Sequence, residues 1–377
     1  MEKQTPIYLD HNATTPLLPD VVAAMMPYLG EHFGNPSSGH VYGQRARQAI
    51  ERAREQVASL LGCQPDEIVF TSGGTEGNNL AIRGVAEVSP RRHVVTSSVE
   101  HPATSQPCAY LERHGFEVAR VPVDEEGQVR VDEARSFVRG DTALVTVMLA
   151  QNETGTLMPI REIARVAHEQ HAVMHTDAAQ AVGKIPVRVD DLDVDLLSIA
   201  GHKLYAPKGV GALYVRRGTT LAPLALGAGH ERGLRPGTEN VASIVGLGAA
   251  CERARRDLET ESARERELRD ELFQELSAGV SGLRLISHPT ERLPNTLNVS
   301  FPGARGSVVL AAAPEIAAST GSACHEGGET PSAVLLAMGM ETAVALGAVR
   351  LSVGRSTTRD QLAQAVRALV RAYRAVA

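Results

Sequence analysis

The chain of 377 residues contains no tryptophan, and its other aromatic residues are seven tyrosines and six phenylalanines. Base-stacking platforms for nucleic acids and the aromatic belts of membrane proteins both need more aromatic side chains than this. A formal net charge of −6 argues against the basic surface through which proteins bind nucleic acids. No apolar run reaches the roughly 20 residues that a membrane-spanning helix requires. We therefore expect neither nucleic acid nor a membrane among the partners.

Cysteine is also scarce, because only Cys63, Cys108, Cys251 and Cys324 are present, far apart and without a CxxC pair. Zinc sites and redox pairs need closely spaced cysteines, so we predict no metal and no disulfide framework. Few, scattered cysteines are typical of a reducing compartment. The first residues also lack the apolar stretch of a secretion signal. The sequence thus predicts a cytoplasmic protein.

Short apolar runs alternate with helix-like stretches through the first two thirds of the chain. The clearest helix is Val41–Leu61, whose apolar residues form one stripe that ends before Gly62. This alternation predicts an α/β fold with a mostly parallel sheet and helices on both faces. The runs expected as buried strands are Ile68–Thr71, His93–Ser97, Ala143–Leu149, Ala172–Asp177, Val194–Ile199 and Gly211–Val215.

The composition changes near Cys251, where the chain becomes charged and lacks strand patterns. We predict one long helix over Cys251–Ala278 and a smaller α+β domain after it. The expected division is a large domain of residues 15–255 and a small domain of residues 1–14 and 256–377. The later elements expected are a strand at Thr296–Phe301, a glycine-rich loop at Ser319–Glu329, a strand at Val349–Val353 and a helix at Thr358–Val376.

Five of the predicted strands end in polar or glycine-rich clusters. Their sequences in chain order are SGGTEGNN, SVEHPAT, AQNETG, AAQ and AGHK. In open α/β sheets, ligands bind beyond the carboxyl ends of the strands. Five clusters at such ends therefore indicate one shared binding site.

Three of these clusters contain candidate ligand-binding residues. The glycines and helix start around Gly74 and Thr75 fit a phosphate cradle, although an ordinary capped turn also explains them. Asp177 closes an apolar strand, so it either caps a helix beginning at Ala178 or binds a protonated ring nitrogen. Lys203 follows another strand and fits a lysine that bonds covalently to an aldehyde cofactor, whereas an exposed loop lysine is the alternative.

Two residues of the predicted small domain are further candidates for the functional site. Cys324 lies among small, polar and glycine residues, which suits a solvent-reachable thiolate nucleophile better than a buried apolar residue. Arg350 lies inside an apolar strand, where its guanidinium needs an anion. That anion is either a protein carboxylate or the carboxylate of a substrate.

Taken together, a set of ordered motifs resembles the pyridoxal-phosphate-dependent cysteine desulfurases and selenocysteine lyases, class V of the aminotransferase-like fold. The resemblance covers nearly the whole chain and implies a type I pyridoxal-phosphate transferase fold with pyridoxal 5′-phosphate as cofactor. The motifs are Tyr8–Thr15, Gly34–Ser38, Thr71–Asn79, Glu100-His101, Asn152–Gly155, Thr176–Gln180, Gly201–Lys203, Arg235–Asn240, Gly321–Cys324 and Arg350–Arg355.

The resemblance implies roles for individual positions. Lys203 would bond to the cofactor and move the substrate α-proton, His101 would stack on the cofactor ring and assist proton transfer, and Cys324 would take up sulfur. Thr238 would reach the phosphate of the other subunit, which implies a homodimer. The implied cofactor contacts are Gly74, Thr75, His101, Asn152, Asp177, Gln180, His202, Lys203 and Thr238, and the implied substrate contacts are Asn35, Asn152 and Arg350.

The reaction that the resemblance implies converts L-cysteine to L-alanine and passes sulfur, as a persulfide on Cys324, to an acceptor protein. The acceptor stays open among iron–sulfur cluster assembly, tRNA thiolation, cofactor biosynthesis and DNA sulfur modification. The alternatives are a lyase that releases selenium from L-selenocysteine, a transaminase or lyase in which Cys324 is incidental, and a non-catalytic sulfur-relay scaffold. One departure is Ala200, since many relatives have a phosphate-binding serine at this position.

Overall fold

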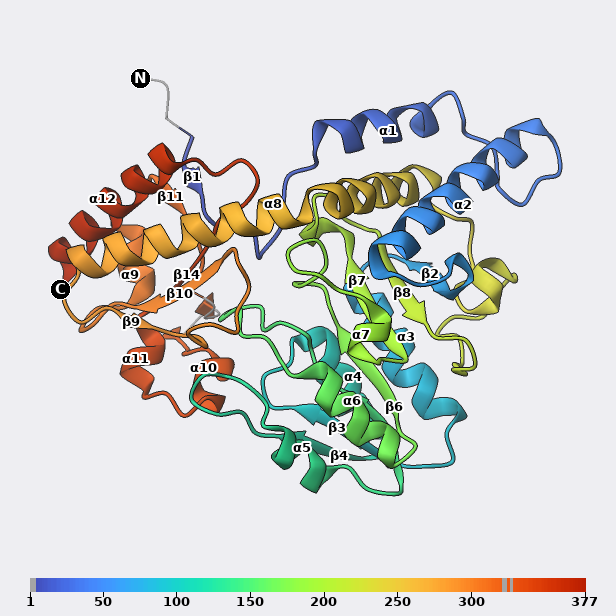
Figure 1. Cartoon of the computed structure of the whole chain (residues 1–377), viewed down its shortest axis with the longest axis horizontal. Coiled ribbons are helices and arrows are strands. Elements are labelled where there is room, and N and C mark those ends of the chain that lie inside the picture. Colours follow the sequence, from blue (N-terminus) through green and yellow to red (C-terminus); the bar gives the residue numbers. More distant parts are fainter. Residues whose placement is uncertain (1–4, 321–323, 326–327) are drawn as a thin grey trace.

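A long helix, α8 (Val241–Gly279), connects a large sheet to a smaller one in the computed structural model (Figure 1). The structure describes residues 5–320, 324–325 and 328–377. Figure 1 shows the large sheet at one end of α8, and the small sheet and both chain termini at the other.

Within residues 5–320, the large sheet has seven strands in the order β2-β8-β7-β6-β5-β3-β4. All neighbours pair in parallel except β8, which runs antiparallel to β2 and β7. The predicted α/β fold with a mostly parallel sheet is therefore confirmed. The strands are β2 (Ile68–Thr71), β3 (His93–Ser97), β4 (Glu117–Val121), β5 (Thr142–Thr146), β6 (Val173–Asp177), β7 (Leu196–Ala200) and β8 (Gly211–Val215).

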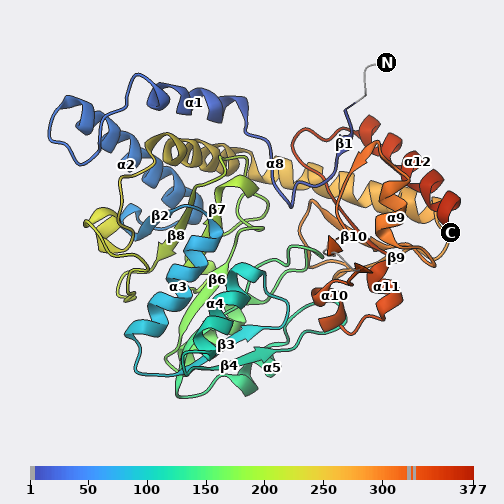
Figure 2. The ribbon, with the colours of Figure 1, turned by 180° about the vertical axis from the view of Figure 1, so that it is seen from behind.

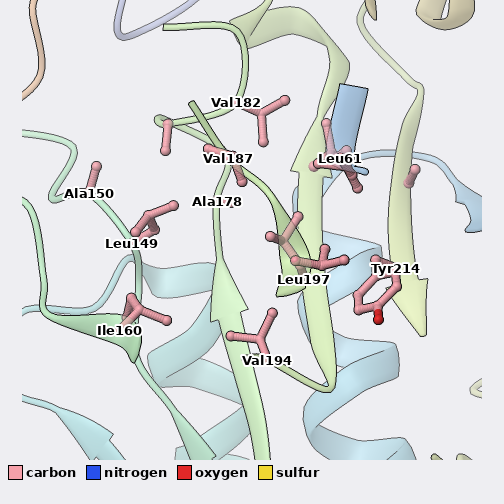
Figure 3. Packing of buried hydrophobic residues seen from close by; sticks show 14 of the residues in the cluster. Leu61, Leu149, Ala150, Ile160, Ala178, Val182, Val187, Val194, Leu197 and Tyr214 are labelled. Atoms are coloured by element: carbon pink, nitrogen blue, oxygen red, sulfur yellow. The ribbon is translucent and has the colours of Figure 1, made fainter. Parts of the chain in front are cut away.

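Helices cover both faces of this sheet because its central strands are apolar on both sides. Ile68 and Phe70 of β2 join one apolar cluster, whereas Val69 between them joins the cluster of the opposite face. Figure 3 shows Leu197 and Tyr214 of neighbouring strands close to Leu61 of α2. The helices before α8 are α1 (Pro19–Leu29), α2 (Val41–Leu61), α3 (Gly74–Val88), α4 (Pro102–Glu112), α5 (Val131–Phe137), α6 (Ile160–Glu169) and α7 (Val189–Leu192).

The small sheet has the order β14-β10-β9 and is antiparallel. A separate apolar cluster joins it to α12 and to the far half of α8. Its strands are β9 (Arg284–Leu285), β10 (Thr296–Ser300) and β14 (Ala348–Ser352), and its helices are α9 (Gly306–Ala311), α10 (Ala333–Ala337), α11 (Thr342–Leu346) and α12 (Arg359–Val376). Two further pairs are β1 (Ile7–Tyr8) with β11 (Ile316–Ala317) and β12 (Cys324–His325) with β13 (Gly328–Glu329). Single 3-10 turns form η1 (Pro65–Glu67), η2 (Gly201–Lys203) and η3 (His230–Gly233).

Helix α8 begins ten residues before the predicted start at Cys251, so that prediction was wrong at its first boundary. The Asn240 side chain accepts a hydrogen bond from the Ser243 backbone and caps the earlier start. Figure 2 shows α8 passing from α1 and α2 to α12, and it packs against all three helices. The predicted domain boundary at residues 255 and 256 falls inside this helix and stays a prediction.

The central strands agree with their predicted ranges within a few residues, and β2, β3 and β8 agree at both ends. Strand β4 was not predicted, because Glu117 and Arg120 interrupt its apolar residues and only Val121 is fully buried at the sheet edge. Among the described residues, no helix combines the length and the apolar character needed to cross a membrane.

A substitution at Gly248 tests how closely α8 packs on α2. A Cβ atom at Gly248 would lie 2.6 Å from Ala53 Cα, inside van der Waals contact. Helix propensity alone favours alanine by about 1 kcal/mol. We nevertheless expect Gly248→Ala to lower the free energy of unfolding by about 1–3 kcal/mol, because the overlap forces the helices apart. Urea unfolding measures this change.

The matched control is Gly30→Ala, because a Cβ atom there meets no neighbour within 4 Å. This variant should unfold near the wild-type urea concentration. A Gly248→Ala protein more stable than the wild type would contradict the close packing of α2 and α8.

Candidate active site

A pocket of about 380 Å³ lies at the carboxyl ends of the central strands. The ends of parallel strands meet at one sheet edge, so the polar clusters that follow β2, β3, β5, β6 and β7 come together there. Arg350 of β14 closes the pocket from the small sheet. Nine predicted site residues line it, namely Gly74, Thr75, His101, Asn152, Asp177, Gln180, His202, Lys203 and Arg350.

Lys203 ends the short turn η2 directly after β7. Its Nζ donates hydrogen bonds to the backbone carbonyls of Asn12 and Ala13, the latter at 2.8 Å. Burial and the positive charge of Arg350 lower the pKa of Lys203 to about 8. This lysine is therefore not the exposed loop residue of the alternative interpretation, and it can lose its proton near neutral pH.

Asp177 is the last residue of β6, and its side chain is 6% exposed. One carboxylate oxygen accepts from Asn78 Nδ2 at 2.6 Å, and the other accepts from the Ala179 backbone at 2.9 Å. Residues 178–180 form a turn, so the alternative that Asp177 caps a helix beginning at Ala178 was wrong. Two N–H donors thus fix the orientation of the carboxylate beside the pocket.

His101 caps the start of α4 and lines the pocket. Its Nδ1 accepts a hydrogen bond from the Ala103 backbone at 3.1 Å, which places the proton of the neutral ring on Nε2. Burial is the largest cause that lowers the His101 pKa. At neutral pH the ring is therefore uncharged and has one defined donor.

The first turn of α3 faces a second pocket, also of about 380 Å³, which Gly74, Thr75 and His202 share with the first. Unpaired N–H groups at a helix start attract an anion. Burial and the charge of Lys203 lower the pKa of His202 to about 4, so its ring is neutral. Ala200 lies beside this turn, since a Cβ atom on Gly74 would lie 3.3 Å from Ala200 Cβ.

Ser198 does not take the place of the phosphate-binding serine that the resemblance implied at position 200. Its hydroxyl lies 3.0 Å from His175 Nε2, and both side chains are fully buried. Ser198 is not among the residues that line either pocket. Besides backbone N–H groups, the side chains available to an anion there include Ser72, Thr75, His202 and Lys208.

Arg350 contacts both a protein carboxylate and the pocket. Its terminal nitrogens donate to Asp10 Oδ1 at 2.8 Å and to the Asn152 carbonyl at 2.9 Å. Its Nε is buried and has no hydrogen-bond partner among the described residues. Asp10 is thus the protein anion that Arg350 needs, and a substrate carboxylate in the pocket would be a second anion for the same guanidinium.

Asn12 and Asn78 belong to the site, yet the sequence analysis assigned them no role. Asn12 is 1% exposed, and its carbonyl accepts from both Lys203 and Gln180. Asn78 is fully buried and orients Asp177. Asn12 lies within the motif Tyr8–Thr15 and Asn78 within Thr71–Asn79. The sequence showed these motifs but not the contacts of their individual residues.

Three predicted residues are not placed in this pocket. Asn35 and Thr238 line a different pocket of about 980 Å³ in the same chain. The backbone of Cys324 pairs with Glu329 in the short sheet of β12 and β13, and its side chain lies outside the described part of the structure. The predicted roles of these three residues remain predictions.

Comparisons with known proteins agree over nearly the whole chain. A family model described as aminotransferase class-V matches residues 7–364. A cysteine desulfurase from Nostoc sp. is 49% identical over 94% of this chain and 90% of that protein. A solved NifS-like protein has a TM-score of 0.91 and 37% identity and covers 97% of this chain and 99% of its own. The solved structure of SspA in complex with cysteine has a TM-score of 0.82 and 38% identity, covering 92% of this chain and 98% of its own.

The lowered pKa of Lys203 predicts its reactivity. Protonated lysine does not attack acylating reagents, so below pH 8 the rate should rise about tenfold per pH unit and then level off above pH 8. Arg350→Gln removes a cation that disfavours the protonated amine, so its midpoint should move to higher pH. Peptide mass spectrometry after brief acetylation of protein stripped of small molecules gives the rates.

The unfolded chain is the control, since its lysines titrate near the ordinary value of about 10.4. A Lys203 labelling rate that keeps rising to pH 10 in the folded protein would contradict the lowered pKa of this half-buried amine.

Proposed function

Because this chain belongs to the aminotransferase class-V family, and cysteine desulfurases resemble it over nearly its whole length, we propose that it is a pyridoxal-phosphate-dependent cysteine desulfurase. The observation that carries this proposal is the convergence of Lys203, Asp177 and His101 on one pocket beside the anion-binding turn of α3. SspA in complex with cysteine, a structural neighbour, supports an amino acid of this kind as substrate.

The pocket fits pyridoxal phosphate by its donor set. Lys203 offers an amine that loses its proton more readily than an ordinary lysine, because its pKa is about 8. Asp177 offers a buried carboxylate for the ring nitrogen, and the start of α3 a site for the phosphate. Gly74, Thr75, Asn152, Gln180 and His202 complete the residues that would hold it, with His101 against the ring. When bound, the cofactor supplies an electron sink for negative charge on the substrate carbons.

The proposed reaction balances without any further reactant. L-cysteine and the Cys324 thiol give L-alanine and a persulfide on Cys324. The Cβ–S bond of the substrate breaks, its electron pair stays with carbon, and carbon gains the proton that the Cys324 thiol lost. The transferred sulfur forms an S–S bond to Cys324 and keeps its hydrogen. A thiol of an acceptor protein can then attack the outer sulfur and restore the Cys324 thiol.

Residues of the chain perform the binding and proton-transfer steps. Arg350, which Asp10 and Asn152 hold in place, would bind the substrate carboxylate with the part of its guanidinium that lines the pocket. The free amine of Lys203 takes the proton from the substrate Cα, because its pKa of about 8 suits a general base near neutral pH. His101 would assist proton transfer through its Nε2–H group, since its Nδ1 accepts from the Ala103 backbone.

Cys324 is the proposed nucleophile, and the other three cysteines are unsuited to the role. Burial raises the pKa of the Cys63, Cys108 and Cys251 thiols to about 12, so almost none is ionised at neutral pH. The reaction needs Cys324 to stay reduced, and we therefore propose that the protein works in the cytoplasm.

Mass spectrometry of the protein after exposure to L-cysteine tests the central step. We expect one added sulfur on the Cys324 peptide and one alanine per persulfide in a single turnover. Cys324→Ala should lower sulfide or persulfide production from cysteine at least about 100-fold, because the sulfur then has no acceptor. The matched control is Cys251→Ala, which removes a buried thiol and should keep most of the activity.

Alanine formation with an unmodified Cys324 would contradict the persulfide. Selenocysteine provides a second comparison on the same variants. Release of selenium that survives Cys324→Ala, together with slow turnover of cysteine, would instead identify a selenocysteine lyase.

We also propose a homodimer in which Asn35 and Thr238 complete the pocket of the partner subunit. Their own chain places them in the separate 980 Å³ pocket, away from the residues around Lys203. Large apolar side chains are exposed on α1, on the segment after it and at the start of α2, and burying them would favour association. They are Met26, Leu29, Phe33, Val41 and Tyr42.

Subunit mixing tests this arrangement. Lys203→Ala removes the reacting amine, and Thr238→Asp places a negative charge against the cofactor phosphate, so each variant alone should be nearly inactive. If the two residues meet across an interface, every mixed dimer has one intact site. Equal mixing after mild unfolding should then restore about one quarter of wild-type activity. No recovery, despite formation of mixed dimers shown by differently sized tags, would place both residues in the same chain's site.

A further inference from the structure

Lys184 is a second buried amine near the pocket, and the proposed function gives it no task. It lies four residues after Gln180, in the turns that follow β6, and its side chain is 7% exposed. Lysine is rarely this buried, because the ammonium group loses its hydration. Lys184 does not line the pocket, so any effect on the pocket passes through residues that do.

The contacts of Lys184 fix the orientation of two pocket amides. Its Nζ donates to Gln180 Oε1 at 2.9 Å and to Asn12 Oδ1 at 3.2 Å. A protonated amine offers only donors, so it holds both amide oxygens toward itself. Gln180 Nε2 then donates to the Asn12 carbonyl at 3.0 Å. Gln180 is left with one N–H and no free oxygen for the pocket that it lines.

A buried carboxylate on α8 balances the charge of Lys184. Glu265 is 5% exposed, and its charge favours the protonated form of Lys184, whereas burial and the charges of Lys203 and Arg350 lower the Lys184 pKa. Burial raises the pKa of Glu265, and Lys184 opposes that rise. The other charged groups around Glu265 are Arg264, Glu261 and Arg355.

We propose that Lys184 is a positioning residue that holds Gln180 as a hydrogen-bond donor toward the ring hydroxyl of the bound cofactor. This inference rests on the proposed function. A donor at that point would stabilise negative charge on the ring oxygen, and it would so lower the pH at which the absorption of the bound cofactor titrates. If the Gln180 amide turns so that it no longer donates to the ring oxygen, this stabilisation is lost. The visible absorption of the holoenzyme should then titrate at a higher pH.

The experiment follows the absorption of the holoenzyme with pH, in the absence of substrate. Lys184→Met keeps the length of the side chain but removes the donors, and we expect the titration midpoint to rise by about one pH unit. Lys184→Arg retains a buried donor and should titrate close to the wild type. Gln180→Ala should shift the midpoint as Lys184→Met does, and the two changes combined should shift it no further.

A double variant separates positioning from simple charge balance. Lys184→Met removes the charge that favours ionised Glu265 and leaves the buried Gln180 oxygen without its donor, so that variant should unfold at lower urea concentration. Lys184→Met with Glu265→Leu removes both charges and should recover stability. Positioning predicts that the double variant keeps the shifted midpoint in spite of this recovery.

Two results would overturn the inference. They are a wild-type midpoint in Lys184→Met, and a return to the wild-type midpoint in the double variant. A wild-type protein that shows no cofactor absorption after addition of pyridoxal phosphate would instead contradict the proposed function.

Discussion

The site depends on the backbone of Asn12, which lies between the two sheets. Its carbonyl accepts from Lys203 and Gln180, and its amide N–H donates to Ser352 Oγ of β14 at 2.9 Å. Its side chain donates to Thr296 Oγ1 of β10 at 2.8 Å. One residue close to the N-terminus thus joins the reactive amine of the large sheet to two strands of the small one. These bonds, together with the hydrogen bond from Arg350 to the Asn152 carbonyl, help to fix Arg350 relative to Lys203.

The sequence predicted those strands and helices whose own residues form a clear apolar run or an apolar stripe. Apolar runs such as Ile68–Thr71 are buried on both faces, and their polar ends, including Asp177 and Lys203, reach the same sheet edge. Strand β4 was missed because an edge strand may be polar, and its pairing with β3 is visible only in three dimensions. The early start of α8 was missed because its glycines resemble a break but pack closely against α1 and α2.

Sequence motifs identified most of the pocket, but they did not reveal which atoms face each other. The bond between Asn78 and Asp177 joins residues 99 positions apart, and the bond between Lys184 and Asn12 joins residues 172 positions apart. No periodicity in the chain indicates such pairs. Arg350 illustrates the same limit, since the need for an anion was clear from its apolar strand but the choice of Asp10 was not.

Helix α8 has a mechanical consequence. Its 39 residues form one continuous rod of roughly 58 Å, to which both sheets are attached along its length. A continuous helix resists sharp bending unless a proline or an inserted group interrupts its hydrogen bonds, and α8 contains no proline. Large hinge rotation of one half against the other would have to break this rod. The spacing across the catalytic cleft is therefore set when the chain folds, and turnover must proceed within an almost rigid frame.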